Sequence, residues 1–574
     1  MDLECKQVSS LEKLTAKSFL QSRTISNRTV MAGERLSYQI GIKSKKSIRA
    51  VVSIESELRD NIKLYAVKNV IMDKPATEEY MENENYITLE PGLMPDMLLP
   101  LEEQNNVLSC GDEIMTVWVK LDVPADVRTG VYELTVNFEL TNIHKESEKE
   151  TIKKTMIVEA ISAVMPEQKL IYTRWLYADC IANQHNVEIH SSEYWDWIEK
   201  YIAAAVDVGI NMILVPVHTP PLDTAIDTQR PCVQLVDIEK KGNKYEFSFK
   251  NLKKFIDICK KYGIKYYEIA HMFSQWGAKY APNIMVIENG KKDYMFGWHV
   301  LATSKEYSEF LPQYIAAISE EVKREGISEN TYFHISDEPA LDNIENYKMA
   351  SDMMRSLIGK SKTIDALSRY EFYEKGLIKC PVTSVKHIHE FLEHEVENQW
   401  VYYCCNPQKV YSNSFIAMPS CRTRVLGYQL YRYDIKGFLH WGYNFYNSQV
   451  SLYEINPYLT TSANGAFPSG DPFIVYPGKE TVYPSIRGEV IYEAIQDMNI
   501  CFALEALIGR TEVVKMIDEA AGRTLRFDDY PCSNEFVEGL RAAMIRKISA
   551  LQSSNVFCTS ERRCKRVQRR EGIN

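Results

Sequence analysis

Near residue 166 the hydrophobic pattern of this chain changes its period, and this change limits the folds open to it. Before that point, runs such as "ERLSYQIGI", "IMTVWVKLDV" and "GVYELTVNFEL" alternate apolar with polar residues. A period of two is typical of strands with one buried face, and the turn clusters between the runs suit a two-sheet sandwich. We therefore predict an N-terminal β-sandwich over residues 1–165. It carries no obvious acid pair or nucleophile, so we expect a supporting or ligand-presenting role.

After residue 166, short β-rich runs alternate with longer helical ones. Strands that alternate with helices indicate βαβ units and a parallel sheet, and eight such units predict a (β/α)8 barrel over residues 166–485. The eight candidate strands are "LIYTRWLY", "MILVPV", "KYYEIAH", "YFHIS", "TIDAL", "VTSV", "QWVYYC" and "GFLHW". A doubly wound open sheet is the competing topology, but it normally brings a glycine-rich phosphate loop, and none is visible. One insertion, residues 233–249, is expected to be a β-hairpin that turns at Lys241, Gly242 and Asn243.

The end of the chain, residues 486–574, has a helical pattern, and we expect its helices to close on the barrel. The basic cluster "ERRCKRVQRRE" at 561–571 is expected to be a solvated tail. The predicted fold class is therefore multidomain α/β, with a β-sandwich, a TIM-like barrel and a C-terminal helical segment.

The composition excludes several kinds of partner. The formal net charge of −10 argues against nucleic acid, because phosphate binding relies on concentrated Lys and Arg. No stretch approaches the ~18 apolar residues of a membrane span, and the N-terminus lacks a secretory signal, so we expect a cytoplasmic protein.

The thirteen cysteines are an odd number scattered through apolar runs, which favours reduced thiols. Cys404 and Cys405 are adjacent, without the second ligand pair that a zinc site needs.

Two neighbouring acids, Asp337 and Glu338, stand in "TYFHISDEPALD", directly after the fourth candidate strand. In a (β/α)8 barrel the catalytic residues lie at the carboxyl ends of the strands. Pro339 restricts the residue before it, so we expect Glu338 to be extended, with both carboxylates at the mouth of the barrel. Two acids so close cannot both ionise freely, so one pKa should rise. The structural alternative is a helix N-terminus, in which Asp337 only bonds free N–H groups.

Cleavage of a glycosidic bond suits this pair. An ordinary retaining glycosidase holds its two carboxyl groups about 5–5.5 Å apart on either side of the bond, and consecutive residues are poorly placed for that. Another division of labour fits better, in which the 2-acetamido oxygen of the substrate attacks the anomeric carbon. Asp337 would hold the acetamido N–H, while Glu338 protonates the leaving oxygen and later activates water. This mechanism needs no metal ion and no organic cofactor.

Aromatic residues follow other candidate strands at the same end. His271 and Trp276 come after the third strand, Tyr402 lies near the end of the seventh, and Trp441, Tyr443 and Asn444 follow the eighth. Sugar rings present apolar C–H faces between hydroxyls, so aromatic walls with a few polar contacts are the expected lining. Any one of these residues alone would more often be core packing. Several at the same end of separate strands indicate a sugar site.

The motifs "EIAHMFSQWGAKYAP", "FGWH", "YFHISDEP", "GFLHWGYNFYN" and "YPSIRGE" together resemble glycoside hydrolase family 123 and its relatives with a DUF4091-type C-terminal region. The resemblance covers most of the chain, including the sandwich. It implies a β-N-acetylgalactosaminidase that acts with retention, through substrate-assisted catalysis, on terminal β-GalNAc, including that of glycosphingolipids. It further implies that Asp337 orients the acetamido group and that Glu338 is the acid/base.

The resemblance also suggests residues that contact the substrate. Trp441 would wall the sugar subsite, and Tyr402 would donate to the acetamido carbonyl. Further candidates for substrate contacts are His271, Trp276, Tyr443, Asn444 and Asp179.

Two alternative functions stay open. A β-N-acetylglucosaminidase or a dual β-hexosaminidase differs only in how it treats the 4-hydroxyl, which one or two hydrogen bonds decide. A carbohydrate-binding protein without turnover could use the same sandwich and barrel.

Overall fold

The N-terminal part of the chain forms two packed β-sheets in the computed structural model, which describes residues 2–81, 86–101 and 106–571, apart from the side chains of residue 80 and residues 554–571. Both sheets have five strands. In strand order, the first contains β1 (Leu3–Ser9), β3 (Arg35–Ser44), β8 (Ile114–Asp122), β5 (Ile62–Met72) and β6 (Gly92–Pro100). The second contains β2 (Asn27–Ala32), β10 (Lys145–Val164), β9 (Gly130–Asn142), β4 (Ile48–Glu55) and β7 (Asn106–Ser109). A short helix, α1 (Ala16–Gln21), links β1 to β2.

The period-two pattern explains this sandwich. Along β4, Ile48, Ala50 and Val52 are fully buried, while the residues between them are exposed. These side chains meet apolar residues of the other sheet in one core, so the predicted β-sandwich is confirmed.

The next part of the chain closes into a parallel barrel. Its strands are β11 (Ile171–Arg174), β12 (Met212–Val215), β15 (Tyr266–Ile269), β18 (Thr331–Phe333), β19 (Lys362–Thr363), β20 (Asp365–Ala366), β21 (Pro381–Ser384), β22 (Trp400–Tyr402) and β23 (Gly437–His440). β11 pairs with both β12 and β23. The two ends of the sheet, β19 and β20, are separated only by Ile364, so they act as one strand and the sheet closes. All eight predicted strands are present, and an open doubly wound sheet is excluded.

Helices follow the strands as the alternation predicts. They are α2 (Ala178–His185), α3 (Ser192–Asp207), α4 (Lys250–Tyr262), α5 (Lys305–Arg324), α6 (Ile344–Ile358), α7 (Tyr370–Glu374), α8 (Ile388–Glu393), α9 (Ser420–Arg424) and α10 (Leu426–Arg432). In α4, Leu252, Phe255, Ile256 and Cys259 are buried at helical spacing while its lysines face solvent. A two-stranded ribbon, β24 (Tyr476–Pro477) and β25 (Val482–Tyr483), precedes the C-terminal helices.

The predicted hairpin is present as β13 (Asp237–Lys241) and β14 (Lys244–Ser248), with Gly242 at φ +62°. A second hairpin, β16 (Ile284–Glu288) and β17 (Lys291–Phe296), extends it to a four-stranded sheet. This second hairpin was not predicted, although its turn, Asn289-Gly290, is a common hairpin dipeptide, and both residues have positive φ.

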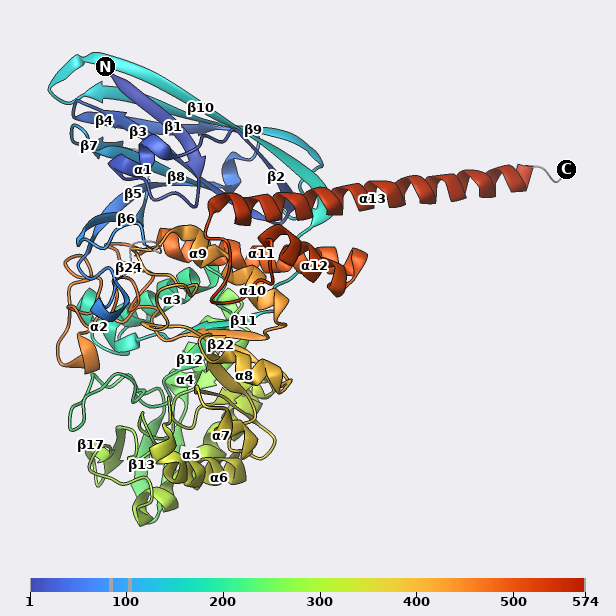
Figure 1. Cartoon of the computed structure of the whole chain (residues 1–574). Coiled ribbons are helices and arrows are strands. Elements are labelled where there is room, and N and C mark those ends of the chain that lie inside the picture. Colours follow the sequence, from blue (N-terminus) through green and yellow to red (C-terminus); the bar gives the residue numbers. More distant parts are fainter. Residues whose placement is uncertain (1, 82–85, 102–105, 572–574) are drawn as a thin grey trace.

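Three helices complete the chain: α11 (Ile486–Ile508), α12 (Arg510–Ala521) and α13 (Asn534–Glu571). α11 lies between the sandwich and the barrel helices (Figure 1) and is buried almost throughout. The predicted basic tail at 561–571 falls on side chains outside the described residues. Of the helices in the described part of the chain, none combines the length and the apolar character that a bilayer span demands.

Buried ion pairs join the sandwich to α11. Lys120 of β8 lies 3.0 Å from Glu489 of α11, and both side chains are fully buried. Arg487 of α11 pairs with Asp96 of β6 at 2.9 Å. Breaking one member of such a pair leaves an unpaired buried charge, so these contacts fix how the two parts meet.

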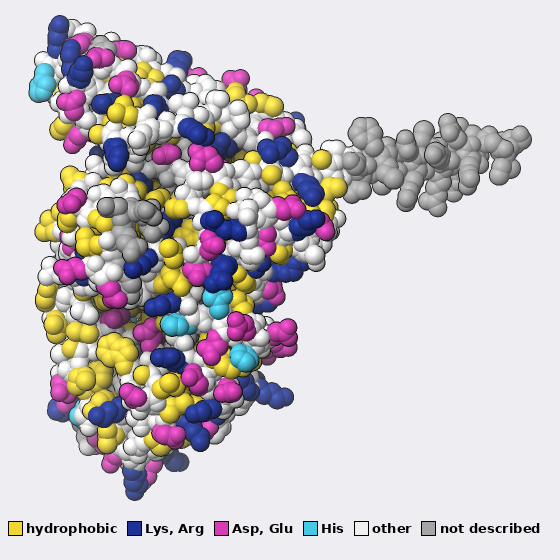
Figure 2. Space-filling model, viewed as in Figure 1, with side chains coloured by type: hydrophobic (Ala, Val, Ile, Leu, Met, Phe, Trp, Pro, Cys, Tyr) yellow, Lys and Arg dark blue, Asp and Glu magenta, His cyan; other side chains and the backbone are white. Residues whose placement is uncertain are grey.

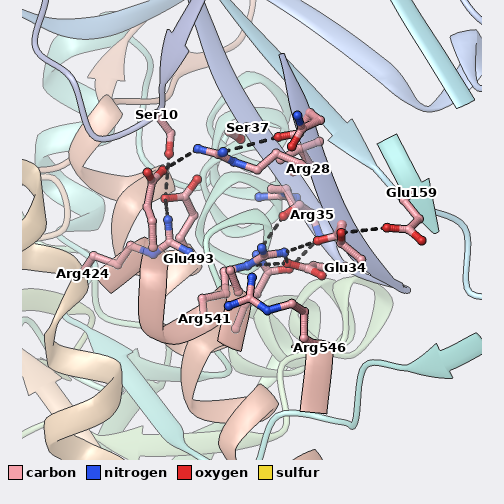
Figure 3. A pocket seen from close by; sticks show the side chains of 16 residues that line it. Ser10, Arg28, Glu34, Arg35, Ser37, Glu159, Arg424, Glu493, Arg541 and Arg546 are labelled. Atoms are coloured by element: carbon pink, nitrogen blue, oxygen red, sulfur yellow. Dashed lines mark hydrogen bonds and ion pairs between the residues drawn. The ribbon is translucent and has the colours of Figure 1, made fainter. Parts of the chain in front are cut away.

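A cavity of about 260 Å³ lies beside this junction, lined by residues of β2, β3, α11 and α13. In Figure 3 Arg541 points to Glu34 and Arg424 points to Glu493. These two arginines are therefore paired with acids of the same cavity.

Acidic and basic side chains are interspersed over the face of the molecule in Figure 2. The side chains that the structure describes form no continuous basic surface on this face of the kind that binds nucleic acid. The domain boundaries at 165/166 and 485/486 remain predictions. β10 ends at Val164, and β11 begins at Ile171.

Candidate active site

A cavity of about 160 Å³ opens at the carboxyl ends of the barrel strands. Its walls come from residues that follow most of the strands, as expected for a (β/α)8 barrel. They are Trp175, Asp223, Gln275, Trp276, Asp337, Glu338, Ala366, Tyr402, Cys404, Cys405, Leu439, Trp441, Gln449, Val450 and Phe467. Five of the predicted site residues thus lie together: Asp337, Glu338, Trp276, Tyr402 and Trp441.

The two acids face different surroundings. Asp337 is 5% exposed, and its Oδ2 accepts a hydrogen bond of 2.8 Å from Gln275 Nε2. Glu338 is exposed, and its Oε1 accepts a hydrogen bond of 2.7 Å from the hydroxyl of Tyr402. One acid is therefore fixed in the wall, while the other is open to solvent at the cavity.

The expectation that Glu338 is extended is wrong. Its φ is +42°, in the left-handed region that non-glycine residues rarely adopt. Two backbone hydrogen bonds hold this segment: Glu338 N–H donates to Ala366 O at 3.1 Å, and Trp276 N–H donates to Asp337 O at 3.0 Å. Tertiary contacts with β20 and the β15 loop thus outweigh the local effect of Pro339. A strained residue held in this way is typical of a functional site.

The raised pKa expected for one acid falls on Asp337. Burial, followed by the charge of Glu338, raises the pKa of Asp337 well above its usual range. The hydrogen bond from Gln275 opposes this shift because it favours the ionised form. Asp337 is thus able to hold a proton at a pH well above the usual range of a carboxyl group.

Gln275 joins Asp337 to a third acid, Asp223. Gln275 Oε1 accepts a hydrogen bond of 2.6 Å from the Asp223 N–H, so its Nε2 must face Asp337. Asp223 has φ +45°, and its carbonyl accepts a hydrogen bond of 2.6 Å from Ser451 Oγ. Burial raises the pKa of Asp223 to about 6. A loop with no regular structure is therefore pinned so that Asp223 lines the cavity.

Aromatic rings form the opposite wall. Trp441 packs at 5.1 Å between ring centroids against both Phe445 and Phe467, and its Nε1 donates to Asp471 Oδ2 at 3.0 Å. Burial raises the pKa of Asp471 to about 7. Trp276 is 51% exposed at the rim. An apolar ring face in the wall and another at the rim match the surface of a sugar.

A residue of the sandwich supports this wall. Asp73, just after β5, accepts hydrogen bonds from Thr461 N–H at 3.1 Å and from Ser469 Oγ at 3.0 Å. Burial would raise the pKa of Asp73, but hydrogen bonds from the hydroxyls and N–H of this loop outweigh it and lower the pKa. The loop that Asp73 holds carries Phe467 into the cavity.

Tyr443 and Asn444, two predicted site residues, do not line the cavity. Tyr443 is fully buried and donates to the backbone carbonyl of Tyr201 in α3 at 2.8 Å. Asn444 exchanges two hydrogen bonds, of 2.9 and 3.0 Å, with the backbone of Tyr177. Their positions after β23 turn them into the core, where they support residues behind the wall.

Asp179 also lies outside the cavity, on α2. Its carboxylate is fully buried, 3.7 Å from Arg230 Nε. The Arg230 guanidinium stacks over the ring of Tyr177 at 5.2 Å, and the Tyr177 hydroxyl donates to Asp223 at 3.3 Å. Asp179 thus touches the site only through this chain of contacts.

A buried charge network lies beneath the cavity. His334 stands between Glu268 of β15, at 2.8 Å, and Asp365 of β20, at 3.3 Å. Burial lowers the pKa of His334, but its hydrogen bonds to Asp365 and Glu268 outweigh this effect and raise the pKa to about 9. Glu268 also accepts from Trp175 Nε1 at 3.1 Å, which fixes the indole that lines the cavity.

His271, the remaining predicted residue, belongs to this layer below the cavity. Its ring stacks on His334 at 4.0 Å between centroids, and neither ring nitrogen has a hydrogen-bond partner in the described chain. Burial, with the nearby charge of His334, holds the pKa of His271 well below its usual range. His271, His334 and Asp365 could each offer an atom to a metal ion. However, a protonated His334 has no free nitrogen lone pair, so this trio fits a hydrogen-bonded core better than a metal centre.

Sequence reasoning missed several wall residues. Trp175 directly follows the first strand, and Gln275 precedes Trp276, so the strand-end rule that found the aromatics would have found both. Asp223 lies eight positions beyond the end of β12 at Val215, in an irregular loop, and no local pattern marks it.

Family models match both parts of the chain. Residues 175–504 match the catalytic domain of glycoside hydrolase 123, and residues 11–142 match the glycoside hydrolase 123 N-terminal domain. No curated protein sequence matches the chain.

Among solved structures, a family 123 glycoside hydrolase from Clostridium perfringens, studied for glycolipid glycan hydrolysis, aligns with a TM-score of 0.70. The alignment has 15% identity and covers 98% of this chain and 100% of that chain. An endo-1,4-β-D-xylanase from Clostridium thermocellum aligns at a TM-score of 0.32, with 10% identity, over 87% of this chain and 93% of that one. This last score is too low to support a conclusion.

The Clostridium perfringens structure supports the fold, and the family model covers more than half of the sequence, including the whole cavity. The chain therefore belongs to glycoside hydrolase family 123 and is a glycoside hydrolase.

Proposed function

We propose that this enzyme is a retaining exo-β-N-acetylgalactosaminidase that removes terminal β-GalNAc by substrate-assisted catalysis. One observation carries the proposal: adjacent acids with opposite surroundings, Asp337 buried and held by Gln275, and Glu338 exposed beside Tyr402. A pair on consecutive residues cannot flank a glycosidic bond, but it can serve two neighbouring groups on one face of a sugar.

In the first step the acetamido carbonyl oxygen of the substrate attacks the anomeric carbon. Glu338 donates its proton to the leaving oxygen, and the bond to the aglycone breaks. Asp337 accepts a hydrogen bond from the acetamido N–H and stabilises the positive charge of the oxazolinium ring that forms. In the second step Glu338 takes a proton from water, which attacks the anomeric carbon and opens the ring. Two displacements give net retention.

The proton of the acid pair must be placed correctly for this cycle. In the free site the raised pKa favours a proton on Asp337. An acetamido N–H directed at Asp337 favours its ionised form, as the Gln275 N–H does, so substrate binding transfers the shared proton towards Glu338.

Tyr402 has a conditional role in this scheme. Its single hydroxyl proton is directed at Glu338 Oε1 at 2.7 Å, while Ser368 Oγ lies 3.2 Å from the hydroxyl oxygen of Tyr402. Donation to the acetamido carbonyl therefore requires Tyr402 to release Glu338 when substrate binds, which leaves Glu338 free to protonate the aglycone.

The choice of GalNAc rests on the family resemblance, and the study of glycolipid glycans with the Clostridium perfringens relative supports a glycosphingolipid head group as one substrate. A β-N-acetylglucosaminidase is the second candidate, since the same acid pair would serve it. A non-catalytic lectin is disfavoured because the chain belongs to a family of glycoside hydrolases.

The function is tested by comparing kcat/KM for the nitrophenyl glycosides of β-GalNAc, β-GlcNAc and β-Gal. We expect β-GalNAc to be the best substrate and β-Gal to be cleaved least, because β-Gal lacks the acetamido oxygen that acts as nucleophile. Equal cleavage of β-Gal would refute the substrate-assisted mechanism, and preference for β-GlcNAc would select the second candidate.

Asp223 is expected to form hydrogen bonds with sugar hydroxyls that lie away from the reacting carbon. Its Oδ2 accepts from Tyr177, while Oδ1 has no protein donor within the described chain. Changing Asp223 to Asn should raise KM for β-GalNAc about 10–100-fold and reduce the preference over β-GlcNAc, because one missing hydroxyl contact is worth about 1–3 kcal/mol. The control is a 4-deoxy-β-GalNAc glycoside, which should be penalised in the parent enzyme and much less in Asp223→Asn. An unchanged penalty in the variant would assign 4-hydroxyl recognition to another residue.

A further inference from the structure

The adjacent cysteines Cys404 and Cys405 line the cavity, just past the end of β22. Side chains of consecutive residues on a strand point to opposite faces. Here the chain has left the strand, and the two Sγ atoms lie only 3.9 Å apart. Both residues are half-buried and line the cavity, so a molecule bound there lies beside them.

The backbone around the two cysteines is held in this arrangement. Asn413 Nδ2 donates to Cys404 O at 2.8 Å, and Gln408 Nε2 donates to Cys405 O at 2.8 Å. Cys404 N–H donates to Asn406 O at 2.9 Å. The thiols are therefore pre-positioned as a pair, and closing a ring through both costs little conformational entropy.

The separation suits chelation by a single atom. One atom that bonds each sulfur at about 2.3 Å can join thiols up to about 4.6 Å apart, so this pair lies within its reach. The described residues provide no third metal ligand near this pair, because the one group of three candidate ligands is His271, His334 and Asp365. An acceptor that needs two sulfurs and no further protein ligand is therefore favoured.

The surroundings also favour a neutral product. Contact with Cys405, followed by burial, raises the pKa of Cys404 well above its usual range, and the nearby charges of Asp471 and Glu338 act in the same direction. A metal ion binds cysteine as the charged thiolate, so a site that disfavours thiolates binds metal ions poorly. Condensation that starts with two neutral thiols and ends with an uncharged adduct avoids this cost.

We propose that Cys404 and Cys405 form a dithiol site for monosubstituted trivalent arsenicals, and that the adduct blocks the sugar cavity. Two S–H bonds and the arsenic–oxygen bond break, two arsenic–sulfur bonds form, and the oxygen leaves as one water. No atom changes oxidation state, so no oxidant or reductant is required. Adduct formation is independent of the proposed function, whereas the block of β-GalNAc cleavage rests on it.

The test uses phenylarsine oxide and a reference protein that carries Cys532→Ser. This change removes the second close thiol pair among the described side chains, Cys421 and Cys532, whose Sγ atoms are 3.8 Å apart. Intact-mass measurement should show one phenylarsenic adduct per chain, and peptide mapping should place it on Cys404 and Cys405. Inhibition should be reversed by 2,3-dimercaptopropanol and not by a monothiol, because only a dithiol matches the chelate.

Adding Cys404→Ser or Cys405→Ser to the reference protein should weaken phenylarsine oxide binding by about 10²-fold, since the second sulfur no longer binds intramolecularly. Equal affinity in these variants, or an adduct mapped elsewhere, would overturn the proposal. The mapping on the reference protein does not depend on how well either variant folds. An adduct on this pair in a protein that does not cleave β-GalNAc would retain the dithiol site and reject the proposed function.

Discussion

Replacing Glu338 with Gln is expected to lower kcat by about 10²–10⁴-fold on β-GalNAc glycosides with a poor leaving group, the range for loss of a general acid/base. Gln has nearly the same shape and accepts the Tyr402 hydrogen bond, but it cannot donate a proton to the glycosidic oxygen. With a nitrophenyl leaving group the first step needs less protonation, so the loss should be smaller and should reflect the water-activating step. Steady-state rates on a disaccharide substrate and on the nitrophenyl glycoside measure both effects.

Azide provides a further check on Glu338. This anion needs no deprotonation to attack the anomeric carbon, so it should partly restore turnover of the nitrophenyl substrate by Glu338→Gln and give a β-glycosyl azide. Asp342→Asn is the matched control, since Asp342 is exposed, lies four positions further along the chain and does not line the cavity. A Glu338→Gln enzyme with parent-like rates on every leaving group would remove Glu338 from the mechanism.

The second large effect is expected from Asp337→Asn. An amide in place of the carboxylate cannot stabilise the oxazolinium charge, and removing one such electrostatic contact typically costs about 10²–10³-fold in kcat. In the parent enzyme the active pair carries one proton, so activity should fall as the pair loses it, and the alkaline limb of the kcat/KM profile should follow the pKa of Asp337, which is raised well above its usual ~3.9. Gln275→Ala should move that limb to still higher pH, since the Gln275 N–H favours the ionised form.

The thermal stability of Asp337→Asn distinguishes a loss of catalysis from a loss of folded protein. A carboxyl group whose pKa is raised on folding contributes most to stability below its unfolded pKa, and stability falls as the pH rises towards the folded pKa. As the pH rises from the unfolded pKa towards the folded pKa, the parent enzyme bears a growing cost of burying Asp337, and Asn removes that cost. The melting temperature of Asp337→Asn should therefore equal or exceed that of the parent. A marked decrease, with activity lost in proportion to folded protein, would contradict the assigned role.

The sequence was sufficient for the fold because strand and helix periods depend on local residues. Each of the eight barrel strands carries a short apolar run, and the position of Asp337 and Glu338 after the fourth placed them at the catalytic end. The second hairpin was not predicted, although its Asn289-Gly290 turn is a local sequence signal for a hairpin.

The site was less predictable because it depends on how irregular loops turn. Trp441 and Tyr443 are two residues apart, yet one lines the cavity and the other donates to Tyr201 in the core. The φ of Glu338 is set by bonds to distant strands and not by Pro339. Asp223 reaches the cavity only because Gln275 and Ser451, distant in sequence, hold its loop.

The contact of Asp73 with the loop that presents Phe467 has an evolutionary consequence. A wall of the catalytic cavity is shaped by a carboxylate that another domain supplies, so recombination that brought in a foreign sandwich would alter the shape of the sugar site. We therefore expect the two domains to be inherited as one unit.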